Sequence, residues 1–560
     1  MKIVTIYFCI VLSSIHSAVA YDQNTEINLV NGNVDAKYEY CLNEADNDDC
    51  QQTGTNECRT YNKGCYRAAV YEHSRIDTRS CTESAGLNLD AFANVTESAS
   101  SNGAKIIVMP EDGLFMGSYA YVDGCLEEIP DPDSLDESND NPCQQPKIYE
   151  NFTILTRLSC IAQKNKIYVV ANYGTKQTCQ PYTNVGERVC PKRGYFRLNT
   201  NVVLDSSGRY IKRYRKYNPF IEVFDKAPDL EETYFDTPMG KFGVFTCFDM
   251  IFQRPAVELV EKHHVDTILF PTWWYDELPM LTAIQYQDGW SWMNRVNLLA
   301  ANILIPDLGS TGSGIYSGSK LLTIGPDHGK SKLLLANLPI HPRDNRMSTT
   351  CEACFEPKLI DFEPKPPSSY KYKNYTLQTT DRVIALSYPN NTIKICTDED
   401  SFCCEISYEI DMHGINTDVL EQMVMIVRNA RRPGTFNFYE QACAVATIEK
   451  MDFLNLDDIR FSKEPVVSFK RLSVSGHFAN KYVYPFAAHD VSNLISRNHR
   501  QYICEEKTND IDQKTFNCHQ EYTHHDPAQI YSFGLYGRKY DEDIINYDEN
   551  LANVKWSELK

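Results

Sequence analysis

The chain has 560 residues, more than one hydrophobic core usually organises, so its length excludes a single domain. Hydrophobic residues make up 42% of the chain and charged residues 23%, a globular composition that excludes a disordered or collagen-like protein. The formal net charge of −20 would repel phosphate backbones and anionic lipids, so nucleic acid is not an expected partner.

The first twenty residues have the pattern of a secretory signal peptide. Lys2 precedes an apolar run at 3–12, and the small residues Ala18-Val19-Ala20 provide a cleavage site. A membrane anchor would need roughly 20 uninterrupted apolar residues, and the polar pair Ser13-Ser14 interrupts this run. No later segment is apolar enough to span a bilayer, and the polar stretch 546–560 lacks the hydrophobic tail of a GPI signal. We therefore expect a secreted, extracellular protein.

The cysteine count agrees with secretion. Cys9 leaves with the signal peptide, so 19 of the 20 cysteines remain, and an odd number leaves one thiol without a partner in the chain. The other 18 can form up to nine disulfides, which suits an oxidising compartment. Four N-x-Ser/Thr sequons also fit an exposed glycoprotein, and they lie at Asn94, Asn151, Asn374 and Asn390.

The first part of the chain alternates buried strands with amphipathic helices, which predicts an α/β fold. Strands are expected at 106–109, 167–170, 244–245 and 267–270. A helix is expected at 255–262, and the spacing of Trp292, Val296 and Leu299 predicts another that packs on the sheet. The acidic segment between Cys125 and Cys143 has no basic residue and is expected to be a solvated loop.

A proline- and serine-rich stretch at 362–369 indicates a domain seam. Beyond it, strands are expected at 383–386, 404–408 and 482–484, in a β-rich domain held together by disulfides. The predicted organisation is a signal peptide at 1–20, a catalytic domain at 21–345 and a β-rich C-terminal domain at 346–560.

Glu111 is the first candidate for catalysis. It follows a predicted buried strand and precedes Gly113, so its side chain projects from the strand end, not into the sheet. A carboxylate in such a partly apolar position can act first as a base and then as an acid. The residue alone also fits a loop or helix-capping role.

Lys216 is the second candidate. Strand alternation over 211–217 puts Lys212, Tyr214 and Lys216 on one face. A lysine near the end of a sheet can stabilise a developing oxyanion, although a solvated basic strand or a dibasic processing site would give the same pattern.

Cys247 is the third candidate and the best choice for the unpaired cysteine. It ends an apolar strand just before the helix predicted from Pro255, and nearby helix N-terminal amides would favour a thiolate there. A structural disulfide is the competing interpretation.

These motifs, in this order, resemble the Glu-Lys-Cys triad of the nitrilase superfamily. The segments 243–252, 265–272, 295–300 and 312–316 are similar to those of its vanin and biotinidase branch, and the resemblance extends over essentially the whole mature chain. It implies an α-β-β-α sandwich followed by the β-rich domain that this branch adds. It also implies Cys247 as nucleophile, Glu111 as base and acid, Lys216 as oxyanion-stabilising cation and Glu222 as a supporting glutamate.

Two segments depart from the pattern of the branch. Asn218-Pro219 stands where vanin-like members often have His-Leu, and Trp273-Trp274-Tyr275 is a bulkier aromatic stretch. Because both segments are expected to border the acyl pocket, they bear on the choice of substrate more than on catalysis.

The function implied is hydrolysis of a small linear carboxamide through a thioester on Cys247, with no metal or organic cofactor. The resemblance implies pantetheine or biotinyl amides such as biocytin, with the pantetheinase-like activity slightly preferred. A catalytically silent secreted glycoprotein is the alternative.

A zinc site of Cys351 and Cys354 with His524-His525 is weaker, because such cysteines usually belong to the disulfide framework of a secreted chain. A serine hydrolase is disfavoured because no Gly-x-Ser-x-Gly elbow surrounds Ser313 or Ser317.

Overall fold

The computed structural model describes residues 64–118, 124–136, 140–326, 329–344, 355–364, 369–386, 388–397, 401–413, 420, 422–432, 437–450, 456, 459–508 and 514–543. The predicted signal peptide, Cys351 and Cys354 lie outside these residues.

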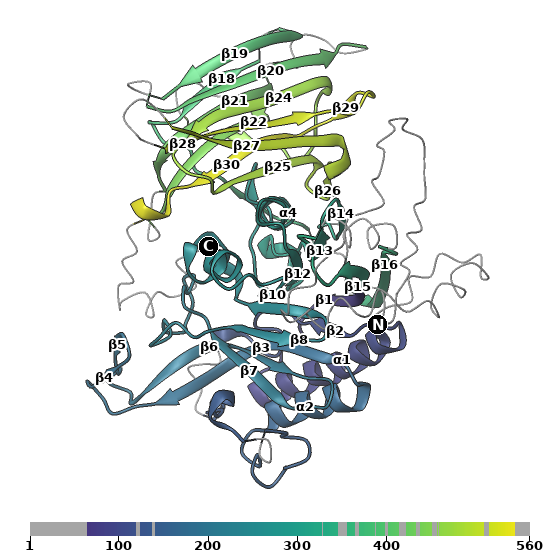
Figure 1. Cartoon of the computed structure of the whole chain (residues 1–560), viewed down its shortest axis with the longest axis vertical. Helices are drawn as coiled ribbons and strands as arrows, with labels where there is room; N and C mark the ends of the chain where they lie inside the picture. Colours follow the sequence, from purple (N-terminus) through teal and green to yellow (C-terminus); the bar gives the residue numbers. More distant parts are fainter. Residues whose placement is uncertain are drawn as a thin grey trace, which may run out of the picture. The chain divides into compact units, whose positions relative to one another are not determined.

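Two mixed sheets form the first half of the fold (Figure 1). The strands of the first sheet are β1 (Cys65–Glu72), β2 (Ile106–Val108), β3 (Tyr168–Thr178), β6 (Tyr195–Leu204), β7 (Tyr210–Arg215), β15 (Lys330–Pro339) and β16 (Lys358–Pro364). Those of the second are β8 (Tyr234–Thr237), β9 (Gly240–Val244), β10 (Thr267–Thr272), β12 (Asn297–Asn302), β13 (Gly314–Ser317) and β14 (Lys320–Thr323). Two short pairs complete this half, β4 (Asn184–Val185) with β5 (Arg188–Val189) and β11 (Glu277–Leu278) with β17 (Lys373–Asn374).

Each sheet has a parallel centre and antiparallel edges. The first sheet has the order β16-β15-β1-β2-β3-β6-β7, with β1, β2 and β3 parallel. The second has the order β14-β13-β12-β10-β9-β8, with β9, β10 and β12 parallel. Apolar side chains from both sheets share one core, and the Tyr66 hydroxyl lies 2.8 Å from Thr267 Oγ1 across it.

Helices cover the outer faces of these sheets. On the first sheet, α1 (Cys81–Ser101) and α2 (Thr153–Asn165) bury Phe92 and Leu158 against Ile107 and Val169. On the second, α4 (Ala283–Asn294) packs Trp290 against Phe245, and the short α3 (Glu258–Glu261) follows a turn. The layering is therefore the predicted α-β-β-α sandwich.

The C-terminal half contains two further, antiparallel sheets. One consists of β18 (Arg382–Ala385), β21 (Met423–Arg431), β22 (Tyr439–Lys450), β23 (Arg460–Phe461), β25 (Val483–Asp490), β26 (Asn493–Leu494) and β30 (Ser532–Arg538). The other consists of β19 (Asn390–Cys396), β20 (Cys403–Asp411), β24 (Ser468–Phe478), β27 (Arg500–Thr508), β28 (Lys514–Tyr522) and β29 (Ala528–Gln529). Both sheets contribute to one core, and a disulfide from Cys404 to Cys443 joins them. The β-rich second half is confirmed.

The strands expected from the sequence are present, but one predicted helix is wrong. Helix α4 ends at Asn294, because Arg295 adopts a left-handed φ of 53° that stops it. Val296 and Leu299 therefore do not continue the helix, and Asn297–Asn302 form the fully buried strand β12. The helix expected at 255–262 is present, as the π-helical stretch Gln253–Val257 that continues into the α-helical Glu258–Glu261. Strand β16, beyond residue 345, still belongs to the first sheet.

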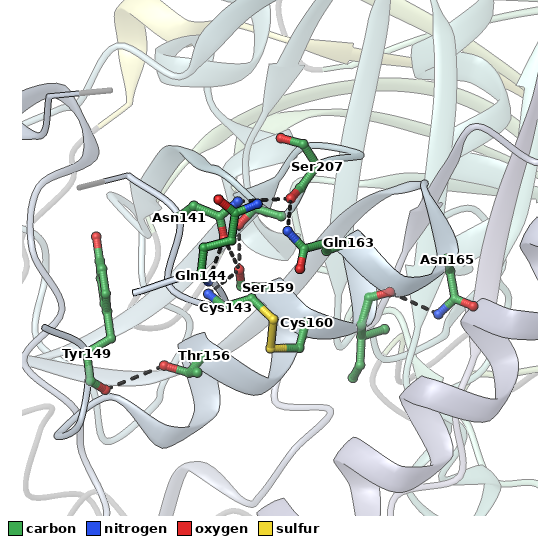
Figure 2. The surroundings of a disulfide bond; sticks show 12 residues. Asn141, Cys143, Gln144, Tyr149, Thr156, Ser159, Cys160, Gln163, Asn165 and Ser207 are labelled. Atoms are coloured by element: carbon green, nitrogen blue, oxygen red, sulfur yellow. Dashed lines mark hydrogen bonds between the residues drawn. A yellow bond between two sulfur atoms is a disulfide. The ribbon is translucent and has the colours of Figure 1, made fainter. Parts of the chain in front are cut away.

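Disulfides hold both ends of the acidic loop to helices. Cys125 is bonded to Cys81, the first residue of α1, and Cys143 is bonded to Cys160 of α2. Figure 2 shows the second bond, where Ser159 Oγ accepts a hydrogen bond from the Cys143 amide at 3.0 Å. Six disulfides are described in all, with the remaining ones at Cys179–Cys190, Cys396–Cys403, Cys404–Cys443 and Cys504–Cys518.

The four sequons differ in exposure. Asn94, Asn151 and Asn390 are exposed, whereas Asn374 is half-buried and its Oδ1 accepts a hydrogen bond from the Phe461 amide at 2.8 Å. Within the described ranges, no helix combines the length and apolar character that crossing a membrane requires.

Candidate active site

Residues that follow four different strands line one pocket. Glu111 follows β2, Lys216 follows β7, Cys247 follows β9 and Trp273 follows β10. The pocket has a volume of about 50 Å³, the space of one or two water molecules. The sequence separates these residues widely, and the two sheets bring them together.

Glu111 is held by three hydrogen bonds. Its Oε1 accepts from Lys216 Nζ and from Asn199 Nδ2, both at 2.7 Å, and its Oε2 accepts from the Trp273 amide at 2.7 Å. The carboxyl is almost completely buried, at 3% exposure. These donors fix both oxygens, so Glu111 points into the pocket in one orientation.

Lys216 lies between two carboxylates. Its Nζ is 3.0 Å from Glu222 Oε1 as well as 2.7 Å from Glu111. Burial opposes the charge of Lys216, but the nearby Glu111 and Glu222 outweigh it and raise the pKa of the ammonium well above its usual range. Burial, with the Glu111 charge adding, raises the pKa of Glu222. The ammonium already occupies the position that a metal ion between these carboxylates would take.

Two buried asparagines orient this cluster, and sequence analysis missed both. Asn199 donates through Nδ2 to Glu111 and, at 2.9 Å, to Glu222. Asn172 in turn donates to Asn199 Oδ1 at 2.7 Å and accepts from the Asp112 amide at 2.9 Å. Both sit within long strands, where the sequence shows only a polar residue among apolar ones. Full burial of an amide side chain is the signal that would have identified them.

Cys247 begins a short 3₁₀ turn, Cys247–Ile251, directly after the strand and its connecting residues. It is buried, and it is the free cysteine among the described residues, which confirms the prediction of an unpaired thiol there. Its φ of 44° lies in the left-handed region, a strained conformation for a non-glycine residue that is common at functional sites. The side chain lines the same pocket as Glu111 and Lys216.

The predicted thiolate character of Cys247 is wrong. Burial, with the Glu111 charge adding, raises the pKa of the thiol, while Lys216 opposes the shift only partly. The turn that follows has five residues and makes no long helix whose N-terminal amides could offset this burial. The resting thiol is therefore neutral.

Asp249 ties the Cys247 turn to the segment that carries Lys216. Its Oδ2 accepts from the Tyr214 hydroxyl at 2.6 Å and from the Thr246 amide at 3.1 Å. Its Oδ1 accepts from both the amide and the side chain of Asn218, each at 2.9 Å. Asn218, one of the departures from the branch, thus supports the backbone of the site and does not line its pocket.

Asp112 and aromatic side chains form the rest of the wall. Asp112 Oδ2 accepts from the Gly117 amide at 3.1 Å, and burial together with the Glu111 charge raises the pKa of Asp112 to about 8. Trp273 and Tyr275 line the apolar side with Phe220, as expected for the aromatic departure, whereas Trp274 does not line the pocket and stacks on Tyr286.

Comparison with known proteins agrees with this arrangement. The carbon-nitrogen hydrolase family model matches residues 67–303, and the vanin C-terminal domain model matches residues 367–543. The pantetheinase of Mus musculus is 36% identical over 436 residues, which cover 75% of this chain and 81% of that protein. The biotinidase of Bos taurus is 32% identical over 466 residues, which cover 75% of this chain and 84% of that protein.

Among solved structures, an amidase from Nesterenkonia sp. aligns with 18% identity and a TM-score of 0.34, covering 50% of this chain and 93% of that one. The chain belongs to the vanin and biotinidase family of carbon-nitrogen hydrolases, a family of amidohydrolases.

Proposed function

We propose that this protein is a secreted hydrolase of linear carboxamides of the pantetheinase type, with Cys247 as nucleophile, Glu111 as general base and acid, and Lys216 as oxyanion-stabilising cation. The observation that carries the proposal is the free Cys247 in one pocket with Lys216, whose ammonium lies 2.7 Å from Glu111. A catalytically silent scaffold protein would not require a free thiol in the same pocket as this paired charge cluster.

The first half of the reaction forms a thioester. Because the resting thiol is neutral, Glu111 removes its proton as sulfur attacks the amide carbon. The charge that develops on the substrate oxygen is stabilised by Lys216 together with backbone amides. Glu111 then gives its proton to the departing nitrogen, the C–N bond breaks, and the amine leaves.

The second half regenerates the thiol. Water attacks the thioester carbon while Glu111 takes one of its protons, and collapse of the tetrahedral anion breaks the C–S bond. The proton returns to sulfur, and the carboxylic acid leaves. Glu222 is a positioning residue in this scheme: with Asn199, it holds the Lys216 ammonium beside Glu111 in both halves.

Pantetheine is the preferred substrate, with a biotinyl amide such as biocytin second, because relatives of both kinds match at similar identity. The test is to incubate the purified full chain with each compound and to quantify released cysteamine and lysine. We expect cysteamine release, and none from a Cys247→Ser variant. Turnover of biocytin alone would reassign the substrate, and turnover of neither would support the silent alternative.

Secretion and domain limits belong to the same proposal. The described disulfides support an oxidising compartment, and the exposed Asn94, Asn151 and Asn390 suit glycosylation better than the half-buried Asn374. The limits proposed from the sequence are 1–20, 21–345 and 346–560, but β16 belongs to the first sheet, so we place the boundary between the two domains after Pro364. Cells that express the chain should release it into the medium without phospholipase, and glycosidase treatment should lower its apparent mass.

A further inference from the structure

Four histidines from three separate segments lie near one another on the surface of the C-terminal half. Three of them, His489, His499 and His524, line a hollow that shares no residue with the active-site pocket. His489 belongs to β25, and His499 ends the 3₁₀ turn Arg497–His499. His524 and His525 follow β28, next to Asp526. The Thr523 amide donates to the His499 carbonyl at 2.8 Å, so the backbone itself joins two of these segments.

The donor atoms are close to the spacing that a metal ion requires. Asp526 Oδ2 lies 3.5 Å from His525 Nε2 and 3.8 Å from His524 Nδ1. One donor atom from each of these three residues lies within 4.8 Å of the others, and the ring centroids of His499 and His524 are 4.1 Å apart. Ligands around a tetrahedral ion with bonds of about 2.0–2.1 Å are separated by roughly 3.3 Å. Side-chain rotation on metal binding would have to close this difference.

The hydrogen bonds of the rings bear on which nitrogens can bind. His489 Nδ1 lies 2.7 Å from the Gln529 carbonyl, which can only accept, so Nδ1 carries the proton and Nε2 keeps its lone pair. This is how metal-binding histidines are commonly oriented. His524 Nδ1 instead accepts from the Asp526 amide at 3.2 Å, so a metal on that nitrogen would replace this single exposed hydrogen bond.

We propose that His524, His525 and Asp526 bind one divalent transition-metal ion of the zinc type, with His499 and His489 beside them. Imidazole nitrogens with one carboxylate oxygen form a donor set that suits Zn²⁺ better than Mg²⁺ or Ca²⁺, which prefer oxygen ligands alone. This site differs from the zinc site weighed from the sequence, because it needs neither Cys351 nor Cys354. It is also independent of amide hydrolysis.

The test uses the full chain without a polyhistidine tag, freed of metal by EDTA and titrated with ZnCl₂ by calorimetry. We expect one Zn²⁺ per chain, and at least tenfold weaker binding in the double variant His524→Ala/His525→Ala. The matched control is His413→Ala, because His413 is also exposed and also lies 3.8 Å from a carboxylate, that of Asp411. The control should bind Zn²⁺ as tightly as the unaltered chain.

Folding and activity are measured on the same variants. Without metal, the double variant should melt at the temperature of the unaltered chain, and Zn²⁺ should raise the melting temperature of the unaltered chain only. Amide hydrolysis should not change in the double variant. The proposal is overturned if no stoichiometric Zn²⁺ binds, if the double variant binds as before, or if His413→Ala weakens binding equally.

Discussion

The protein buries two charge clusters of opposite composition, and the difference separates a reactive site from a structural one. In the pocket, one cation, Lys216, lies between two carboxylates, Glu111 and Glu222. Between the two halves of the fold, one carboxylate, Asp288 of α4, lies between two cations. Its oxygens are 2.8 Å from Arg497 Nε and 2.6 Å from an Arg500 terminal nitrogen.

The direction of the pKa shifts follows from these compositions. In the pocket, burial and the charge of the second carboxylate raise the pKa of Glu222, so this carboxyl accepts a proton more readily than an exposed glutamate does. At Asp288, burial is outweighed by Arg497 and Arg500, which lower the pKa and keep the carboxylate charged. An excess of carboxylates thus permits proton transfer. An excess of guanidinium groups instead keeps the single carboxylate ionised.

The largest effect is expected from Glu111→Gln, which removes the proposed base and acid but keeps the shape of the side chain. Turnover of the amide substrate should fall at least ~10³-fold, about 4 kcal/mol in the barrier. The melting temperature should change little, because Lys216 still has Glu222 as its partner. Steady-state kinetics and thermal melts check both statements, and an active Glu111→Gln enzyme would refute the assigned base.

The variant Lys216→Met tests the same cluster by removing its cation. Turnover should again be lost, but here the protein should also lose stability, because two buried carboxylates remain without their cation. Thermal melts compare the melting temperatures of Lys216→Met and Glu111→Gln. Equal melting temperatures would show that Lys216 does not compensate both carboxylates.

The next effect is expected at the other cluster. Asp288→Asn leaves Arg497 and Arg500 buried without a counter-charge, which costs about 3–5 kcal/mol. Denaturant unfolding measures the loss, while kcat per folded molecule should stay close to its original value because Asp288 does not line the pocket. A stable but inactive variant would contradict the structural role.

A smaller effect is expected from pH. Burial raises the pKa of Asp112 to about 8, of Glu72 and Asp276 to about 7, and of Asp249 to about 6. These values exceed those of the unfolded chain, near ~4, so the native state binds more protons over this range and its stability falls as pH rises. We expect the free energy of unfolding to fall steadily from pH 5 to pH 8 as these carboxyls lose their protons.

Melts at pH 5, 6, 7 and 8 test this dependence, with Asp112→Asn as the comparison variant. Its curve should be flatter, because it lacks the carboxyl with the highest of these pKa values. Asp288 acts in the opposite direction: its contribution is lost only as pH falls through its lowered pKa. A melting temperature that rises from pH 5 to pH 8 would be inconsistent with the raised pKa values.

The smallest effect concerns the reactivity of Cys247. N-ethylmaleimide should modify one described cysteine in the native chain, Cys247, but about tenfold or more slowly than it modifies glutathione at pH 7.5, since the buried thiol is neutral. Peptide mass spectrometry locates the label, and residual hydrolysis should fall in step with labelling. Fast labelling would instead support the thiolate that the sequence predicted at Cys247. The control is Cys247→Ser, which should not be labelled.

The sequence predicted the strand ends well because a buried apolar run followed by Pro or Gly is a local signal, as at Glu111. Prediction from the sequence failed where residues distant in the chain determine the local structure or the role of a side chain. Asn172 and Asn199 gain their role only when β3 and β6 bring them beside Glu111. Leu299 fits a helical spacing, yet the left-handed turn at Arg295 starts a strand before it. The pKa of Cys247 depends on how deeply the folded chain buries its thiol, and no local sequence pattern predicts that burial.

The neutral state of Cys247 also determines how the protein tolerates oxidants. A thiolate attacks the oxygen of a peroxide and becomes a sulfenic acid, and further oxidation to sulfinic acid destroys the nucleophile irreversibly. An oxidising compartment keeps the disulfides of the protein formed. In the same compartment, a free cysteine that is ionised at rest would be oxidised and lost as a nucleophile. Burial and a raised pKa keep the resting Cys247 thiol protonated, so its sulfur resists this oxidation better than an exposed thiolate would.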